Sequence, residues 1–174
     1  RIFFMNHTPI NLVIAINRLY VKYAYVMLYS FLCHHPEPVS VYILHHELTP
    51  EDEATLQTLS QQFAMHISLV YVPDSLLPPP EVLKTSSWGI EAYFRLAITD
   101  LLPASVDRAL YLDTDIIVNA PVYDLYELDF GSKLIAACKE FTCHPPFGNY
   151  RDVLFAPLFE HGFSYFNSGR SEER

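Results

Sequence analysis

Short hydrophobic runs and longer amphipathic stretches alternate along this chain. Runs bounded by polar residues predict strands that are covered on both faces, and they lie at residues 12–16, 39–44, 67–72 and 109–112. The stretches between these runs are long enough for helices. Alternation of strand and helix favours an α/β fold with a mostly parallel sheet and helices on both faces. A further strand is predicted over residues 134–137.

The first two predicted helices differ in how clearly their ends are marked. Residues 20–33 carry one charge, Lys22, which predicts a helix that is buried nearly all round. The second helix begins at Thr49 as N-cap, with Pro50 at the first helical position and acidic residues in the first turn.

The second half of the chain holds a third predicted helix and a long loop. Residues 91–102 predict a helix that turns Tyr93, Leu96 and Ala97 toward the core. Residues 139–163 contain several prolines and predict a long loop, and loops of this length are often functional.

Composition narrows the class of protein. A chain of 174 residues, 51% of them hydrophobic, is consistent with one globular domain. Its formal net charge of −9 argues against nucleic acid as a partner, because phosphate binding needs clustered Lys and Arg. Three cysteines, an odd number, favour a reduced, cytoplasmic protein, and no hydrophobic run is long enough to predict a membrane span.

The candidate chemistry is concentrated at Asp113 and Asp115, between the hydrophobic run 109–112 and another that starts at Ile116. If both aspartates continue the strand, its period of two places them on one face with Cα atoms roughly 7 Å apart. Two carboxylates this close repel each other, and a divalent cation with a preference for oxygen ligands relieves the repulsion. The pair therefore predicts a metal site at the rim of the sheet.

Four segments resemble glycosyltransferase family 8, which includes lipopolysaccharide galactosyltransferases and glycogenin. The segment 111–115 resembles the family's DxD motif, and 90–96 resembles its Tyr-x-Arg-Leu segment. Residues 121–128 are similar to its Pro-Leu-x-x-Leu-Trp stretch, with Tyr126 in place of Trp, and 165–169 are similar to Tyr-Phe-Asn-Ala-Gly.

The resemblance implies a GT-A fold and a retaining, metal-dependent transfer of a hexose from UDP-galactose or UDP-glucose to a glycan or lipopolysaccharide-type acceptor. It implies Mn²⁺ or Mg²⁺ as cofactor, held by Asp113 and Asp115, with Arg95 beside the nucleotide or donor sugar. The donor-binding residues implied in this way are Ala15, Asn17, Tyr20, Arg95, Asp113, Thr114, Asn167, Ser168 and Gly169. The location it implies is cytoplasmic or peripheral to the inner membrane.

The same resemblance sets expected boundaries. Residues 1–10 are expected to be an N-terminal extension or vector-derived, 11–169 a single GT-A domain without its C-terminal part, and 170–174 a polar tail. The family's third metal ligand, a His, would then lie beyond residue 174. Where the family has acidic residues after the first strand, this chain has 17–19, Asn-Arg-Leu.

Two alternatives stay open at this point. One is a truncated, non-catalytic chain that binds a nucleotide. The other is a phosphohydrolase of the haloacid dehalogenase type, whose nucleophile motif is also DxD after a strand. Ile117, where that class has Thr or Val, argues against the second alternative. The sequence does not indicate an oligomeric state.

Overall fold

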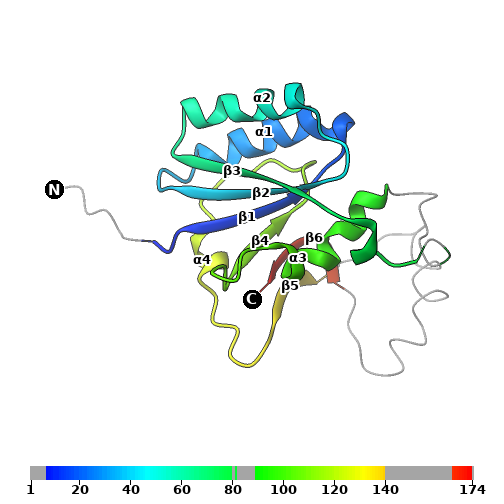
Figure 1. The fold of residues 1–174 in the computed structure, drawn as a ribbon. Helices are drawn as coiled ribbons and strands as arrows, with labels where there is room; N and C mark the ends of the chain where they lie inside the picture. The colour runs from blue at the N-terminus through cyan, green and yellow to red at the C-terminus, as the bar shows by residue number, and fades with distance from the viewer. Residues whose placement is uncertain (1–6, 80, 82–88, 140–165, 174) are drawn as a thin grey trace, which may run out of the picture.

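The computed structural model describes residues 7–79, 81, 89–139 and 166–173, the last segment and residues 138–139 through their backbone alone. These residues form one sheet with strand order β3-β2-β1-β4-β6-β5 (Figure 1). The strands are β1 (Ile10–Ala15), β2 (Val39–His45), β3 (Met65–Tyr71), β4 (Ala109–Leu112), β5 (Ile135–Lys139) and β6 (Phe166–Glu173).

The sheet is parallel over β3, β2, β1 and β4, and antiparallel where β6 pairs with β4 and β5. Parallel neighbours need crossover connections, and helical segments supply them. The α-helices are α1 (Val21–Leu32), α2 (Pro50–Gln57), α3 (Ile98–Leu101) and α4 (Tyr123–Tyr126), and the 3₁₀ helices are η1 (Arg18–Tyr20), η2 (Thr58–Gln61), η3 (Asp74–Leu76) and η4 (Ile90–Ala97). The predicted α/β fold with a mostly parallel sheet is confirmed.

Each face of the parallel strands packs against a separate hydrophobic layer. On one face Leu12 and Ile14 of β1 belong to a cluster with α1 and α2. On the other face Val13 of the same strand packs in a cluster with Phe94 and Ile98, from η4 and α3. This alternation explains why the strands are continuously hydrophobic, since both of their faces are covered (Figure 1).

The two N-terminal helices match their predicted positions, but one of them is less buried than predicted. Thr49 caps α2 by accepting a hydrogen bond from the Asp52 amide, and the Asp52 carboxylate accepts from the Thr49 amide. The prediction that the first helix is buried nearly all round is wrong, because Tyr23, Val26 and Tyr29 of α1 are 45–52% exposed. The sheet, α2 and the segment after β4 cover only part of the helix surface.

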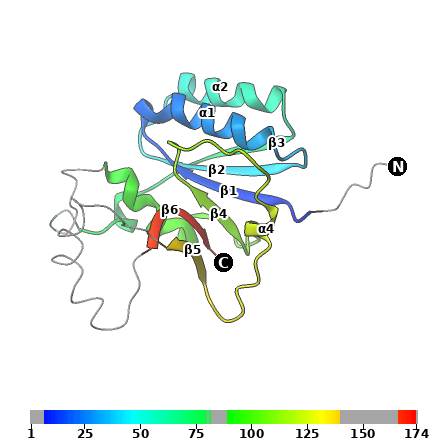
Figure 2. The ribbon, with the colours of Figure 1, turned by 180° about the vertical axis from the view of Figure 1, so that it is seen from behind.

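The segment after β4 also helps to hold α1 in place. Figure 2 shows it passing beside α1 before it reaches α4. There the amide of Val118 donates a hydrogen bond to the Ser30 hydroxyl, at 3.0 Å. The buried Val118 side chain joins the same hydrophobic cluster as α1.

The third predicted helix forms at the predicted place with a different geometry. Residues 90–97 are a 3₁₀ helix, and only the last turn, α3, is α-helical. Side chains three residues apart superimpose in a 3₁₀ helix, so Phe94 and Ala97 are the buried pair. Leu96 is 63% exposed, which contradicts the prediction that it faces the core.

The expected boundaries at both ends need correction. Ile10 is a buried member of β1, and His7 stacks on Tyr123 at 3.7 Å between ring centroids, so 7–10 are not an extension. Residues 170–173, predicted as a tail, continue β6 and pair with β4, because a strand needs only backbone bonds to join a sheet. The predicted loop after residue 139 lies outside the described residues.

Candidate functional site

The candidate site lies where the strand order reverses. The chain leaves β1 toward β2 on one side, and β4 flanks β1 on the other. In open α/β sheets, ligands bind at this point outside the carboxyl ends of the strands. A cavity of about 270 Å³ opens there, lined by Ala15, Ile16, Asn17, Tyr20, Gly89, Glu91, Ala92, Arg95, Tyr111, Asp113, Thr114 and Asp115.

Apart from the three residues of β6, every predicted donor-binding and metal-binding residue lines this cavity. Asp113 and Asp115 do so by a different geometry from the one predicted. Strand β4 ends at Leu112, and residues 114–115 form a turn, so the strand period of two does not apply to the pair. Thr114 between them is buried, while Asp115 is exposed.

Arg95 and Tyr111 hold the Asp113 carboxylate. The Arg95 guanidinium donates to Asp113 Oδ1 at 3.3 Å, and the Tyr111 hydroxyl donates to the same oxygen at 3.0 Å. Arg95 also donates to the Ala92 carbonyl at 2.8 Å and lies over the Tyr111 ring, 4.5 Å from its centroid. These contacts place the positively charged guanidinium of Arg95, on η4, beside the aspartates that follow β4.

The end of β1 supplies the opposite group of lining residues. Asn17 caps η1, because its side-chain oxygen accepts a hydrogen bond from the Leu19 amide at 3.0 Å. The Asn17 oxygen is therefore used locally, and its amide NH₂ group is the part that could serve a ligand. Tyr20 lies in the same short helix and is 44% exposed.

Asn167, Ser168 and Gly169 are placed by their backbone alone. They lie in β6, whose last pair with β4 joins Leu112 to Arg170. Extending this antiparallel register by one residue puts Gly169 level with Asp113. The predicted pocket role of these three residues stays a prediction, with their strand running beside the candidate site.

The residues present fit a divalent cation of the Mg²⁺ or Mn²⁺ type. Both bonds to Asp113 end on Oδ1, and within the described residues Oδ2 and the Asp115 carboxylate have no bonding partner. The described part of the chain holds no group of three or more His, Cys, Asp or Glu arranged for a metal. Mg²⁺ in nucleotide sites is commonly held by one or two carboxylates plus phosphates and water, so two aspartates suffice.

Sequence reasoning missed two polar residues of the cavity, Glu91 and Tyr111. Tyr111 precedes Asp113 by two positions, so the strand period could have indicated it. Glu91 gave no such signal in the sequence. Only the structure shows that η4 brings both Glu91 and Arg95 to the lining of the cavity.

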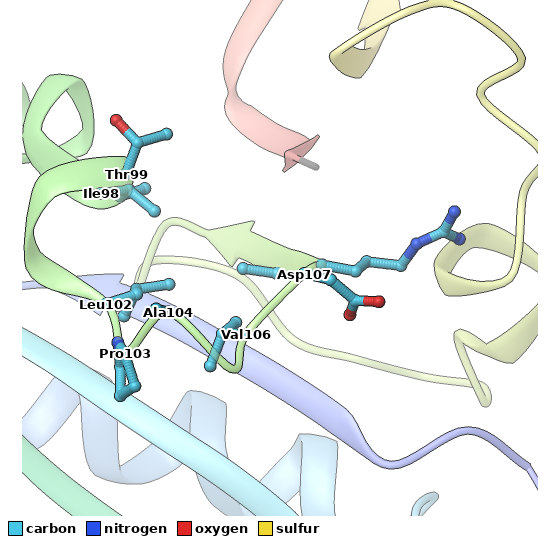
Figure 3. Close-up of a pocket in the computed structure, with 9 residues that line it drawn as sticks. Ile98, Thr99, Leu102, Pro103, Ala104, Val106 and Asp107 are labelled. Atoms are coloured by element: carbon cyan, nitrogen blue, oxygen red, sulfur yellow. The ribbon is translucent and has the colours of Figure 1, made fainter.

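A second cavity, of about 140 Å³, lies near the start of β4. Figure 3 shows its lining, which is largely hydrophobic and includes Ile98, Leu102, Pro103 and Val106. None of the predicted site residues lies there, so it is not a candidate for the predicted chemistry.

Comparisons with known proteins identify the family to which this chain belongs. Residues 11–170 match the model of glycosyl transferase family 8, and the chain belongs to that family. This family membership excludes the phosphohydrolase alternative. Within the described residues no helix is long and apolar enough to cross a membrane.

Relatives of known sequence or structure are similar over nearly the whole chain. A putative glycosyltransferase of Haemophilus influenzae is 22% identical over 91% of this chain and 46% of its own length. The probable galacturonosyltransferase-like 7 of Arabidopsis thaliana is 31% identical over 95% of this chain and 45% of its own length. The chain thus spans less than half of these two relatives.

A solved structure supports the same fold. The galactosyltransferase LgtC, in complex with donor and acceptor sugar analogues, superimposes with a TM-score of 0.75 and 21% identity. The match covers 94% of this chain and 57% of LgtC. The fold is accordingly that of the GT-A glycosyltransferases.

Proposed function

We propose that this chain carries the donor site of a retaining hexosyltransferase that uses UDP-galactose or UDP-glucose and a divalent cation, with a glycan as acceptor. The observation that supports this most strongly is the cavity at the ends of β1 and β4, where Asp113, Asp115 and Arg95 meet. Family membership and the fold shared with LgtC favour sugar transfer over other chemistry.

The two aspartates would hold the cation, Mn²⁺ or Mg²⁺. When bound, such a cation offsets the negative charge of a diphosphate leaving group. Arg95 would orient the Asp113 carboxylate, because it is itself fixed by the Ala92 carbonyl and the Tyr111 ring. A guanidinium held by several contacts loses little freedom on binding, which suits it to position a charged ligand.

The nucleoside would lie against the end of β1. Ala15 offers a small side chain there, Asn17 an amide group, and Tyr20 an aromatic ring. Asn167, Ser168 and Gly169 of β6 are proposed to border the sugar, which agrees with the strand pairing of β6 beside β4.

A transfer assay tests the proposal. The chain is incubated with UDP-galactose or UDP-glucose, Mn²⁺ and a panel of glycan acceptors, and UDP release and product anomeric configuration are measured. The proposal predicts acceptor-dependent UDP release that disappears with EDTA, and a product that keeps the configuration of the donor.

Binding of UDP without any release would favour the alternative of a non-catalytic nucleotide-binding chain.

A further inference from the structure

One charged group in the cavity has no part in the proposed metal site. Glu91 is half-buried, lines the cavity and stands four residues before Arg95 on η4. Of the two carboxylates, the Arg95 guanidinium bonds to that of Asp113. Within the described residues the Glu91 carboxylate has no hydrogen bond and no ion pair.

Gly89 leaves room for this carboxylate because it has no side chain. A Cβ atom added to Gly89 would lie 2.0 Å from Glu91 Oε2, far inside van der Waals contact. The carboxylate therefore lies in the space that a side chain at residue 89 would take. Any larger residue there would displace it.

The chemistry of the site limits what Glu91 can meet. An ionised carboxylate accepts hydrogen bonds and repels anions, so it cannot serve a diphosphate. The cation would be shared between Asp113, Asp115 and the phosphates, which leaves Glu91 as a net negative group. Neutral hydroxyl groups are the ligands that satisfy it, and hydrogen bonds to charged groups are among the stronger ones.

We infer that Glu91 binds hydroxyl groups of the donor sugar and selects neutral hexoses against hexuronic acids. The inference rests on the proposed function and names the sugar class that its donor site accepts. A hexuronic acid carries a carboxylate where a hexose has a neutral CH₂OH group, and Glu91 would repel this carboxylate at short range in a partly dehydrated cavity. The similarity to galacturonosyltransferase-like proteins gives this distinction its interest, because their names indicate a carboxylated sugar.

The test measures dissociation constants by calorimetry for UDP, UDP-galactose and UDP-galacturonate, each with Mn²⁺ and without acceptor. The wild-type chain is expected to bind UDP-galactose at least about tenfold more tightly than UDP-galacturonate, as expected when one charge-charge repulsion is unscreened. Glu91→Gln, which keeps size and removes charge, is expected to bring the two constants within about threefold while UDP itself binds as before.

Two further variants separate position from charge. Gly89→Ala keeps the charge and displaces the carboxylate, so it is expected to reduce the discrimination in the same direction. Glu53→Gln removes an exposed charge from α2 and is expected to leave all three constants unchanged.

The outcomes distinguish this inference from the proposed function. If wild type binds none of the three ligands, the donor site is wrong and the role of Glu91 is wrong with it. If UDP binds and Glu91→Gln keeps the full discrimination, only the role of Glu91 is contradicted. A change in melting temperature with an unchanged ratio would assign Glu91 to the first turn of η4 alone, and an equal loss for UDP would assign it to the nucleoside; both contradict the inference.

Discussion

The two ends of the parallel strands use polar residues in opposite ways. At the amino ends of β1 and β2, His7, His35, Glu37, Val122 and Tyr123 form what we term the amino-end cluster. His35 uses both ring nitrogens, one against the Phe31 carbonyl at 2.6 Å and one accepting from the Val122 amide at 2.9 Å. The Tyr123 hydroxyl donates to Glu37.

At the carboxyl ends of the same strands, several carboxylate oxygens lack a hydrogen-bond partner in the described part of the chain. Asp115, Glu91 and Oδ2 of Asp113 have no partner within the described residues, although all three residues line a cavity. Glu91 and Asp113 are half-buried and Asp115 is exposed, so water can satisfy these oxygens in the free chain. Three carboxylates gathered in one cavity nevertheless favour a site for a ligand. The polar residues at the amino ends thus bond to one another, whereas carboxylate oxygens without a partner in the described chain line the candidate cavity.

The largest effect is expected from Asp115→Ala. Removing one of two cation ligands should reduce Mn²⁺-dependent UDP affinity by more than about 100-fold, since even partners of metal ligands contribute about 10- to 100-fold. The melting temperature without ligand should not change, because Asp115 is exposed and has no partner in the described chain. Calorimetry with and without Mn²⁺ measures the affinity. Asp124→Ala, an exposed acidic residue of α4, is the matched control.

An Asp115→Ala chain that binds UDP with Mn²⁺ as tightly as wild type would contradict a ligand role for the carboxylates at the carboxyl ends. It would show that the unsatisfied carboxylate is merely hydrated.

His35→Ala should have the reverse effect, a loss of stability with no loss of affinity in the folded chain. The substitution removes a buried side chain and leaves the half-buried Val122 amide without its acceptor, which costs about 2 kcal/mol in free energy of unfolding. Urea denaturation measures it. His34→Ala, one residue away and only half-buried, should change stability by less than about 0.5 kcal/mol. Equal losses for both variants would contradict the structural role of His35.

Arg95→Lys tests whether the site needs the shape of the guanidinium group or only its positive charge. Lysine keeps the charge, but it cannot bond the Ala92 carbonyl and Asp113 together while stacking on Tyr111. We expect about a tenfold loss of UDP affinity, equal to about 1.4 kcal/mol. Arg18→Lys, at an exposed pair with Asp52, is the control and should bind UDP normally. Unchanged UDP affinity in Arg95→Lys would show that Arg95 contributes only its positive charge.

The smallest effect concerns pH. Burial lowers the pKa of His35 below its usual 6.5, and this outweighs the opposing effect of the hydrogen bond that its ring donates to the Phe31 carbonyl. The unfolded chain therefore binds a proton more readily, so the free energy of unfolding falls as pH drops through 6.5 toward the lower folded pKa. The loss is at most about 1.4 kcal/mol per pH unit for one group. Urea denaturation between pH 7.5 and 5.5, in buffers about one unit apart, should show a slope that His35→Gln reduces. An unchanged slope in that variant would contradict the assignment.

Much of this fold could be predicted from patterns that depend on neighbours in sequence. The strand runs are continuous because both faces are covered, and the Thr49–Asp52 capping box is a local device. Features set by distant contacts were missed. Residues 170–173 join the sheet through backbone bonds to β4, and their polar side chains give no sign of this pairing. The exposed face of α1 carries Tyr and Val where a polar surface would be expected.

The candidate site shows the same division. Asp113 and Asp115 are two residues apart in sequence and could be predicted as a pair, even though a turn and not a strand sets their geometry. Arg95 was implied by the resemblance alone, and its bond to Asp113 depends on how η4 packs across the sheet. Glu91 could not be found, because its significance lies in having no partner, a property that only the folded chain reveals.

The most direct test of the account is thermal denaturation of the 174-residue chain with UDP, with and without Mn²⁺, using GDP and phosphate as controls. A ligand at about 100 times its dissociation constant stabilises a protein by about 2.7 kcal/mol, enough for a clear shift in melting temperature. We expect a shift in melting temperature that requires UDP and Mn²⁺ together and is absent in Asp115→Ala. The same melting temperature under all conditions, or an equal shift with phosphate, would contradict a donor site at the ends of β1 and β4.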